Sequence, residues 1–417
     1  MKIVFESATF ATPEGGTVSD LFTADGKIVN AFPKSEADRI VDCRGKFLMP
    51  GVIDCHVHFR EPGGEYKEDW NSGSRAAVIG GVTTVLDMPN TNPPTVSLEA
   101  LEEKRKLVHG RSYVNYGFFF GVDGANFDGM ASVRNVPGYK MYMGSSTGSL
   151  LADKPEVWEK AFRIAKSKNL PIVVHAEDEA SIKAGKRDCD CAMIAVDAAL
   201  QLRKTIGNKL HIAHVSCAGE LSLIQKNHNS DLTCEVCPHH LYFSIGDMHD
   251  AYLKMYPPLR REEDLRALWE GIRSGAVNII ATDHAPHSLE EKAQALDTAP
   301  AGVPGVEFVL PLMLNEVNNK MLSFERLIEL LCRHPAAIFG IKNKGRLEVG
   351  YDADLVLVDM TIEKTITRDM VLSKCGWSPY EGYKLKGWPV MTVVGGEVVC
   401  ENREVLGGKL GRECDFW

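Results

Sequence analysis

The sequence predicts an α/β fold, in which a (β/α)8 barrel of the TIM type is joined to a small composite β-domain formed by the N- and C-terminal segments. The chain has 417 residues, which is long for one simple domain and suits a large barrel with a smaller appendage. Its middle alternates strand-like and helical patterns, whereas both ends carry only short strand-like runs. The hydrophobic fraction of 44% is ordinary for a globular protein with a substantial core.

Eight short apolar runs in the middle of the chain are predicted strands. They cover residues 52–58, 82–88, 113–122, 139–143, 171–175, 210–214, 232–236 and 277–283. Helical patterns between most of them cover residues 70–79, 98–108, 154–167, 192–204, 220–227 and 261–273. Eight strands that alternate with helices predict a parallel barrel, which we expect to occupy residues 49–345.

The two ends of the chain have the same β-like character. Residues 1–48 contain strand-like runs at 2–6, 20–23 and 26–31. Residues 346–417 contain a strand at 354–359 and a hairpin over 391–400 with a Gly-Gly turn. We expect these two segments to pair as one small β-domain.

The charge balance indicates a small-molecule enzyme. The net charge is −9, from 47 basic and 56 acidic residues, which argues against nucleic acid or an anionic membrane as the main partner. No apolar stretch approaches the roughly 20 residues of a membrane span, and the N-terminus lacks the pattern of a signal peptide.

The cysteines indicate a reduced, cytoplasmic protein. There are eleven, an odd number, and they are scattered along the chain, so we expect no disulfide framework. In particular, we expect Cys189 and Cys191 to be solvated.

The most informative motif is His56-Val57-His58, at the end of the first predicted barrel strand. Side chains two residues apart point to the same face of a strand, so the two imidazoles lie together. Imidazole is the commonest transition-metal ligand among side chains, and a pair forms half of a metal site. A surface strand with two spare histidines is the alternative that this motif alone leaves open.

Further polar residues fall in or just after the later strands, where function sits in such barrels. They are Asn90, Lys140, His175, His214 and Asp283. Four histidines and one aspartate are too many ligands for one closed tetrahedral zinc, and they suit a two-metal site.

Lys140 lies in an otherwise uncharged strand, where a bare ammonium is costly to bury. A desolvated lysine loses its proton more easily, and the free amine can add carbon dioxide to give a bidentate carbamate that bridges two metals. The alternative is an ion pair with a buried acid, which the sequence alone favours.

Taken together, the motifs resemble those of the class I dihydroorotases, within the amidohydrolase superfamily, over nearly the whole chain. The matching segments are residues 54–63 (DCHVHFREPG), 87–91 (DMPNT), 140–148 (KMYMGSSTG), 175–177 (HAE), 213–216 (AHVS), 237–241 (CPHHL), 256–260 (YPPLR), 282–287 (TDHAPH) and 350–355 (GYDADL). Each is modest evidence by itself, but their order and spacing are highly specific.

The resemblance implies a role for each site residue. His56, His58 and Asp283 hold one Zn²⁺, His175 and His214 hold a second, and carboxylated Lys140 bridges them. Asp283 is also the general base and then the general acid. The implied reaction is the reversible hydrolysis of dihydroorotate to N-carbamoyl-L-aspartate in pyrimidine synthesis, and a homodimer is the assembly that the family suggests.

Arg60 is the expected selector of a small anionic cyclic amide. It lies two residues after His58, and a guanidinium there can grip a carboxylate, which dihydroorotate carries and hydantoin, dihydrouracil and allantoin lack. The alternative for Arg60 is a surface ion pair with Glu61. By resemblance, Asn90 and His287 join Arg60 on the carboxylate.

One residue departs from the family pattern. Tyr256 stands where class I relatives usually have Asn, which puts the exact substrate in doubt but not the reaction type. Two rival functions stay open: an allantoinase or dihydropyrimidinase-like enzyme, and a catalytically silent homologue that acts as a scaffold. The second rival would be expected to have lost metal ligands, and this chain has them all.

Overall fold

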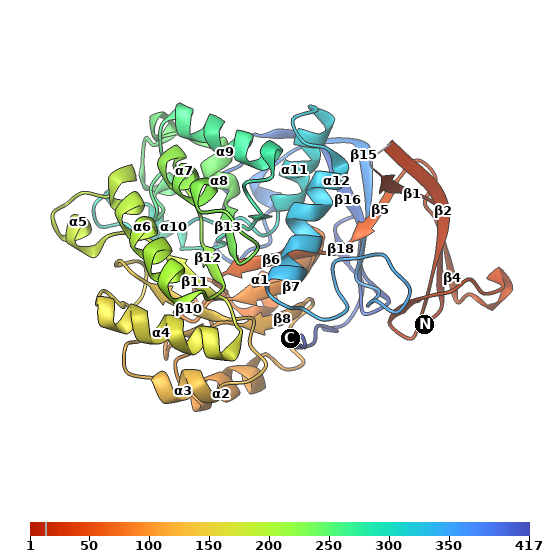
Figure 1. Ribbon diagram of the computed structural model, residues 1–417. Coiled ribbons are helices and arrows are strands. Elements are labelled where there is room, and N and C mark those ends of the chain that lie inside the picture. The colour runs from red at the N-terminus through yellow and green to blue at the C-terminus, as the bar shows by residue number, and fades with distance from the viewer. Residues whose placement is uncertain (13–14) are drawn as a thin grey trace.

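The computed structural model describes residues 1–12 and 15–417. In Figure 1, the barrel and its helices occupy one side of the molecule, and the red and blue strands of the two chain ends lie together on the other. The two parts are built from different kinds of sheet: parallel in the barrel and mostly antiparallel in the appended domain.

Short parallel strands form the barrel wall. Their sequences are apolar on both faces, as is typical of strands buried on both sides. They are β6 (Val52–Val57), β7 (Val82–Asp87), β8 (Asn115–Phe118), β9 (Phe120–Gly121), β10 (Tyr139–Tyr142), β11 (Ile172–His175), β12 (Leu210–Ile212), β13 (Leu232–Val236) and β14 (Ile279–Ile280). A bridge between Val57 and His284 joins the first strand to the segment after the last. The predicted (β/α)8 barrel is confirmed.

The third predicted strand, over residues 113–122, is divided in the structure. Its first half, β8, pairs with β7, and its second half, β9, pairs with β10. Phe119 separates the halves, is fully buried, and packs against Phe339 with ring centroids 5.4 Å apart. Because of this break, residues 115–121 can pair with β7 on one side and with β10 on the other. The two neighbouring strands run in different directions, as the twist of a barrel requires.

Helices cover the outside of the barrel. The longer ones are α1 (Trp70–Ile79), α2 (Leu98–Val108), α4 (Pro155–Lys168), α6 (Cys189–Ile206), α7 (Ala218–Lys226), α9 (Glu262–Ser274) and α11 (Val309–Asn318). The shorter ones are α3 (Phe127–Ser132), α5 (Glu179–Lys183), α8 (Pro238–Tyr242), α10 (Leu289–Lys292), α12 (Phe324–Ile328), the π-helix η4 (Glu329–Arg333) and α13 (His334–Ile338). Side-chain caps such as Asp69 and Ser97 begin several of them.

The appended domain is one sheet drawn from both ends of the chain, as predicted. Its N-terminal strands are β1 (Ile3–Thr12), β2 (Gly15–Ala24), β3 (Lys27–Val29), β4 (Arg39–Asp42) and β5 (Phe47–Pro50). Its C-terminal strands are β15 (Leu355–Thr365), β16 (Lys384–Val394), β17 (Glu397–Glu401) and β18 (Glu404–Val405). Strand β5 pairs with both β1 and β15, so it joins the two halves.

The last residues of the chain leave this sheet and contact the barrel. The Cys414 N–H donates to the Tyr116 carbonyl at 2.8 Å, and the Lys209 ammonium lies 4.0 Å from the Trp417 ring centroid. Lys209 directly precedes β12, so the C-terminus covers the end of the barrel at which the strands begin. The opposite end, where the strands finish, carries the predicted site.

The expectation that Cys189 and Cys191 are solvated is wrong, because Cys189 forms a disulfide with Cys217. It joins the start of α6 to the residue before α7, and Cys191 is fully buried rather than solvated. Two cysteines 28 residues apart give no sequence signal for pairing unless the loops that hold them are known to be adjacent. Nine other cysteines are free thiols, and the cytoplasmic location stays a prediction.

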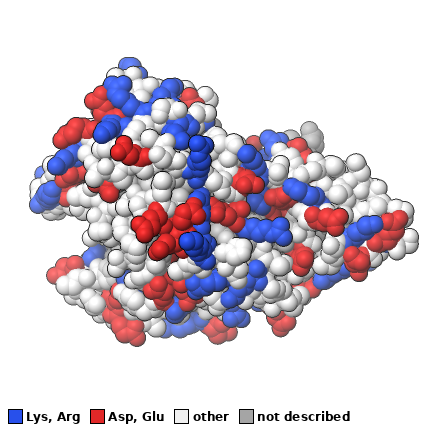
Figure 2. All heavy atoms as spheres, turned by 90° about the horizontal axis from the view of Figure 1, so that it is seen from below, with Lys and Arg blue, Asp and Glu red and all other residues white. Residues whose placement is uncertain are grey.

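The surface carries both signs of charge. Figure 2 shows Lys and Arg interspersed with Asp and Glu over the face in view. Within the described ranges, no helix combines the length and the apolar character that crossing a membrane requires.

The junction of barrel and β-domain rests on a buried ion pair, which gives a prediction. Lys344 contacts Asp354, and Asp354 also accepts hydrogen bonds from the Asn115 amide at 3.0 Å and the Gly395 N–H at 2.8 Å. Lys344→Met leaves a buried carboxylate without its cation, so we expect the free energy of unfolding to fall by about 3 kcal/mol. Urea unfolding measures this, and the exposed Lys342→Met is the control; equal midpoints for both variants would contradict the assignment.

Candidate metal centre and substrate pocket

The first cluster of the site joins the two ends of the barrel wall. His56 lies at the end of β6, His58 comes directly after that strand, and Asp283 follows β14. The Asp283 Oδ1 lies 3.3 Å from His56 Nε2 and 3.0 Å from His58 Nε2. Two imidazole nitrogens and a carboxylate oxygen thus converge on one point, as the ligands of a divalent metal do.

The other ring nitrogen of each of these histidines is held by a side chain. His56 Nδ1 contacts the Glu235 carboxylate, and His58 Nδ1 lies 2.7 Å from Asn90 Oδ1. If both Nδ1 atoms donate, the lone pairs of the Nε2 atoms are directed at Asp283. Partners of this kind orient metal-binding imidazoles and raise their basicity.

The second cluster is formed by His175, at the end of β11, and His214, just after β12. His175 Nδ1 lies 2.9 Å from His214 Nε2, and His175 Nε2 lies 3.1 Å from Glu177 Oε2. Glu177 is thus a close neighbour of His175, but the hydrogen bond that joins Glu235 to His56 has no counterpart here among the described residues. Burial lowers the pKa of both His175 and His214, which favours the neutral form that a metal requires.

Lys140 lies in β10 and lines the same pocket as the two clusters. It is fully buried, and its ammonium has no hydrogen-bond partner among the described residues. Burial lowers its pKa to about 8. An orphaned, easily deprotonated amine that lines the same pocket as four imidazoles and a carboxylate fits a metal-bridging carbamate, and no acid of the described residues forms an ion pair with it.

Three residues of the site adopt left-handed backbone conformations, with φ of 63° at Arg60, 37° at His214 and 47° at Asp283. For a residue with a side chain, this conformation costs about 1–2 kcal/mol. Such strain persists only where the surroundings impose it, and it gathers at functional positions. Here it occurs where each chain segment turns out of the barrel wall.

Arg60 lies in the pocket rather than in a surface ion pair. Its Nε donates to the Pro286 carbonyl at 3.1 Å, and its Nη2 lies 3.2 Å from His287 Nε2. Glu61, the alternative partner, is instead bound to Arg111 at 2.7 Å and accepts the Trp70 N–H at 3.0 Å.

The three predicted carboxylate-binding residues lie at different depths. Arg60 and Asn90 line the pocket, and Asn90 bridges His58 and the Thr147 carbonyl, which it contacts at 2.8 Å. His287 is fully buried behind Arg60, and its Nε2 lies 3.0 Å from the Ala301 carbonyl. The structure therefore brings all three together, with His287 as support for Arg60.

The pocket contains both clusters, Lys140 and parts of several loops. Its lining residues are His56, His58, Arg60, Asn90, Lys140, Tyr142, Ser146, Thr147, His175, His214, Tyr256, Asp283, Ala285, Ala301 and Gly302. Every metal ligand predicted from the sequence is in this set.

Sequence reasoning missed the two carboxylates behind the histidines. Glu235 lies inside the buried strand β13, and Glu177 follows His175 by two residues; both are at most 1% exposed. The available signal is a charged residue within an apolar run, which marks Glu235 as it marks Lys140.

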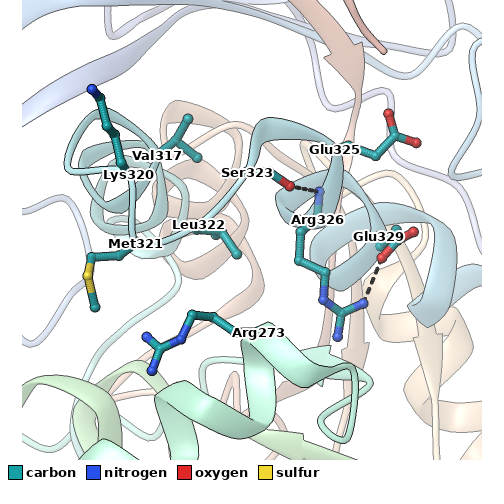
Figure 3. Close-up of a pocket in the computed structure, with 9 residues that line it drawn as sticks. All are labelled: Arg273, Val317, Lys320, Met321, Leu322, Ser323, Glu325, Arg326 and Glu329. Atoms are coloured by element: carbon teal, nitrogen blue, oxygen red, sulfur yellow. Dashed lines mark hydrogen bonds and ion pairs between the residues drawn. The ribbon is translucent and has the colours of Figure 1, made fainter. Parts of the chain in front are cut away.

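A second hollow lies outside the barrel, between α9 and the segment from α11 to η4 (Figure 3). Most of its charged groups are already paired: Arg326 with Glu329 at 2.7 Å, Arg273 with Glu270 at 2.8 Å, and Glu325 with Arg333 at 2.7 Å, whereas Lys320 is exposed. The chemistry-bearing residues thus gather in the barrel pocket and not in this one.

Comparisons with known proteins identify the family of this chain. The model of the amidohydrolase family matches residues 47–399. A dihydroorotase of Pyrococcus furiosus is 40% identical, with 88% of this chain and 85% of that protein covered. A dihydroorotase of Methanosarcina mazei is 38% identical, with coverages of 93% and 90%.

Solved structures share the architecture. An L-hydantoinase (dihydropyrimidinase) from Arthrobacter aurescens matches with a TM-score of 0.94 and 32% identity, with 99% of each chain covered. A dihydropyrimidinase from Brevibacillus agri matches with a TM-score of 0.90 and 24% identity, with 99% and 98% covered, which shows the fold alone. The resemblance inferred from the motifs is confirmed, and the chain belongs to the amidohydrolase family.

Proposed function

We propose that this chain catalyses the reversible, metal-dependent hydrolysis of dihydroorotate to N-carbamoyl-L-aspartate. Dihydroorotases that are 34–41% identical to it over most of its length support this activity. The observation that carries the choice of substrate is Arg60, whose guanidinium lines the same pocket as the histidine clusters. A cyclic amide with a carboxylate fits a pocket that offers both a hydrolytic centre and a cation.

The metal ligands follow from the two clusters. His56, His58 and Asp283 would hold one Zn²⁺, and His175 and His214 a second, with carboxylated Lys140 between them. A bound divalent pair lowers the pKa of water and polarises the scissile carbonyl. The protein contributes neutral imidazoles: burial lowers the pKa of His58 to about 4, so it is unprotonated near pH 7.

Asp283 is the group that moves the proton. It is buried, lines the pocket, and its side chain is held between His56 and His58. We assign it to take the proton of the attacking water and to deliver it to the ring nitrogen as the C–N bond breaks. In the reverse direction, the same carboxylate removes the proton from the ureido nitrogen.

Arg60 would bind the substrate carboxylate, with Asn90 beside it. His287 and the Pro286 carbonyl hold the guanidinium in place, so little side-chain entropy is lost on binding. His287 would act mainly through Arg60. A homodimer remains a proposal from family resemblance.

A hydantoinase-like activity is the second candidate, favoured by the likeness to the L-hydantoinase structure. Hydantoin is a neutral cyclic amide and leaves the Arg60 charge without a partner. A silent scaffold is disfavoured because all the ligands of the proposed centre are present and converge.

A substrate panel tests the proposed function. We expect the zinc-loaded protein to hydrolyse L-dihydroorotate, with dihydrouracil, hydantoin and allantoin much slower, and a chelator to abolish the activity. Arg60→Ala should raise KM for dihydroorotate about 10–100-fold, because a charged hydrogen bond is lost. Arg44→Ala, on the exposed part of the β-domain, is the control. Faster turnover of a neutral ring by the wild type would favour the hydantoinase alternative.

Asp283→Asn should lower kcat by about 10²–10⁴-fold, because the amide cannot accept the proton. Metal content, measured by mass spectrometry of the same preparation, should stay largely unchanged. Asp153→Asn, which removes only a surface pair with Lys183, is the control. Substantial turnover by Asp283→Asn would remove Asp283 from the proton-transfer role.

Glu235→Gln should weaken metal binding about 10–100-fold, because the carboxylate that orients His56 is lost. Equilibrium competition with a chromogenic chelator gives the affinity. Glu307→Gln is the matched control, since Glu307 is also a buried carboxylate but pairs with Arg403 away from the site. Equal affinities for the two variants would refute the supporting role of Glu235.

A further inference from the structure

Tyr256 occupies a substrate-facing position in the loop that follows β13. Its side chain is half-buried and lines the pocket together with Arg60, Thr147 and Gly302. This residue is the departure from the family motif noted in the sequence. Where an amide side chain would offer hydrogen bonds, Tyr256 offers the face of a ring.

A guanidinium covers the Tyr256 ring. The central carbon of Arg187 lies 3.5 Å from the ring centroid, which is the separation of a stacked cation–π pair. Tyr256 lines the pocket, whereas Arg187 and Lys254, whose ammonium lies 5.9 Å from the same ring centroid, are not among the lining residues. Arg187 thus packs against a ring that borders the pocket.

Arg187 is itself fixed from three directions. It pairs with the fully buried Glu177 at 3.3 Å and donates to the Ser145 carbonyl, and its own carbonyl accepts from Arg260 Nη1 at 2.9 Å. These partners lie in loops after β10, β11 and β13. The stack is thus built into the rim of the barrel.

We propose that Tyr256 is a specificity-determining residue whose ring packs against the flat amide portion of the substrate ring, and that Arg187 positions it. This inference rests on the proposed cyclic-amide hydrolysis and adds to Arg60, which selects the carboxylate. Ring stacking supplies dispersion energy without requiring a particular hydrogen-bond pattern. Because the contact is alike in the ground state and the transition state, it sets KM rather than kcat.

Arg187 also connects the ring to the second cluster. Glu177 Oε2 lies 3.3 Å from Arg187 and 3.1 Å from His175 Nε2, so one carboxylate serves both. Removal of the Arg187 charge leaves that carboxylate buried beside a proposed metal ligand. A loss of Arg187 should therefore affect metal binding, which a loss of Tyr256 should not.

Steady-state kinetics of Tyr256 variants test the proposal on two ligands. With dihydroorotate as substrate and dihydrouracil as substrate or competitive inhibitor, we expect Tyr256→Leu to raise KM or Ki about fivefold for both, with kcat nearly unchanged. Tyr256→Phe should stay within about twofold of the wild type, because it keeps the ring. The equal effect on a charged and a neutral ring separates this role from that of Arg60, whose loss should affect dihydroorotate alone.

Two results would overturn the proposal: wild-type constants for Tyr256→Leu, or equal losses for Tyr256→Phe and Tyr256→Leu, which would assign the effect to the hydroxyl. If the wild type turns over neither ligand, the proposed function fails, and calorimetric binding of both ligands to the same variants decides the role of the ring.

Arg187 variants test the positioning role. Arg187→Lys keeps a charge for Glu177 but loses the flat stack, so KM should rise about two- to threefold with metal affinity unchanged. Arg187→Met should raise KM and also weaken metal binding. Lys186→Met, at the exposed neighbouring position, is the control. Wild-type KM in Arg187→Met would refute the positioning role.

Discussion

The buried carboxylate of Glu235 is the constraint on which the site depends. It contacts His56 Nδ1, lies 3.1 Å from His211 Nε2, and accepts the His214 N–H at 3.2 Å. One side chain on β13 therefore orients a residue of the first cluster and the backbone of the second. Burial alone would raise the pKa of Glu235, but the His56 and His211 rings that contact it hold that pKa well below its usual range. Glu235 is 1% exposed, so loss of its partners would leave a buried charge without compensation. The positions of the neighbouring imidazoles are therefore tightly constrained.

The strained backbone of the site has a geometric cause. His214 and Asp283 have positive φ immediately beyond their strands, so their side chains turn into the barrel mouth instead of continuing the alternation of the wall. Asp54 stabilises the second of these turns, because it accepts the Thr282 N–H at 3.1 Å and the Thr282 hydroxyl. Burial raises the pKa of Asp54 to about 6. The hydrogen bonds to Asp54 thus offset the backbone strain at Asp283. Such an arrangement is expected where the geometry of a site must be fixed before a ligand binds.

Much of this was predictable from the sequence because two regularities coincide in a barrel. Strand periodicity located the wall, and the rule that function lies at the carboxyl ends of the strands selected His56, His175 and His214 among thirteen histidines. What the sequence left open was pairing between distant residues. For Lys140 the sequence alone favours an ion pair with a buried acid, but its ammonium has no hydrogen-bond partner among the described residues. The Cys189–Cys217 bridge and the Glu177–Arg187 pair depend on which loops are neighbours, and no local pattern encodes that.

The division of labour between wall and loops explains how one architecture serves related reactions. The proposed metal ligands lie in strands or directly after them, where the barrel fixes their positions. Arg60 and Tyr256, in contrast, lie in the loops after β6 and β13, and each is held by its own partner, His287 or Arg187. A change of loop residue can therefore alter which ring is accepted without disturbing the hydrolytic centre. The chain can therefore share its fold with a hydantoinase and its sequence with dihydroorotases. Similarity of fold reflects the barrel wall, whereas the choice of substrate depends on residues in the loops.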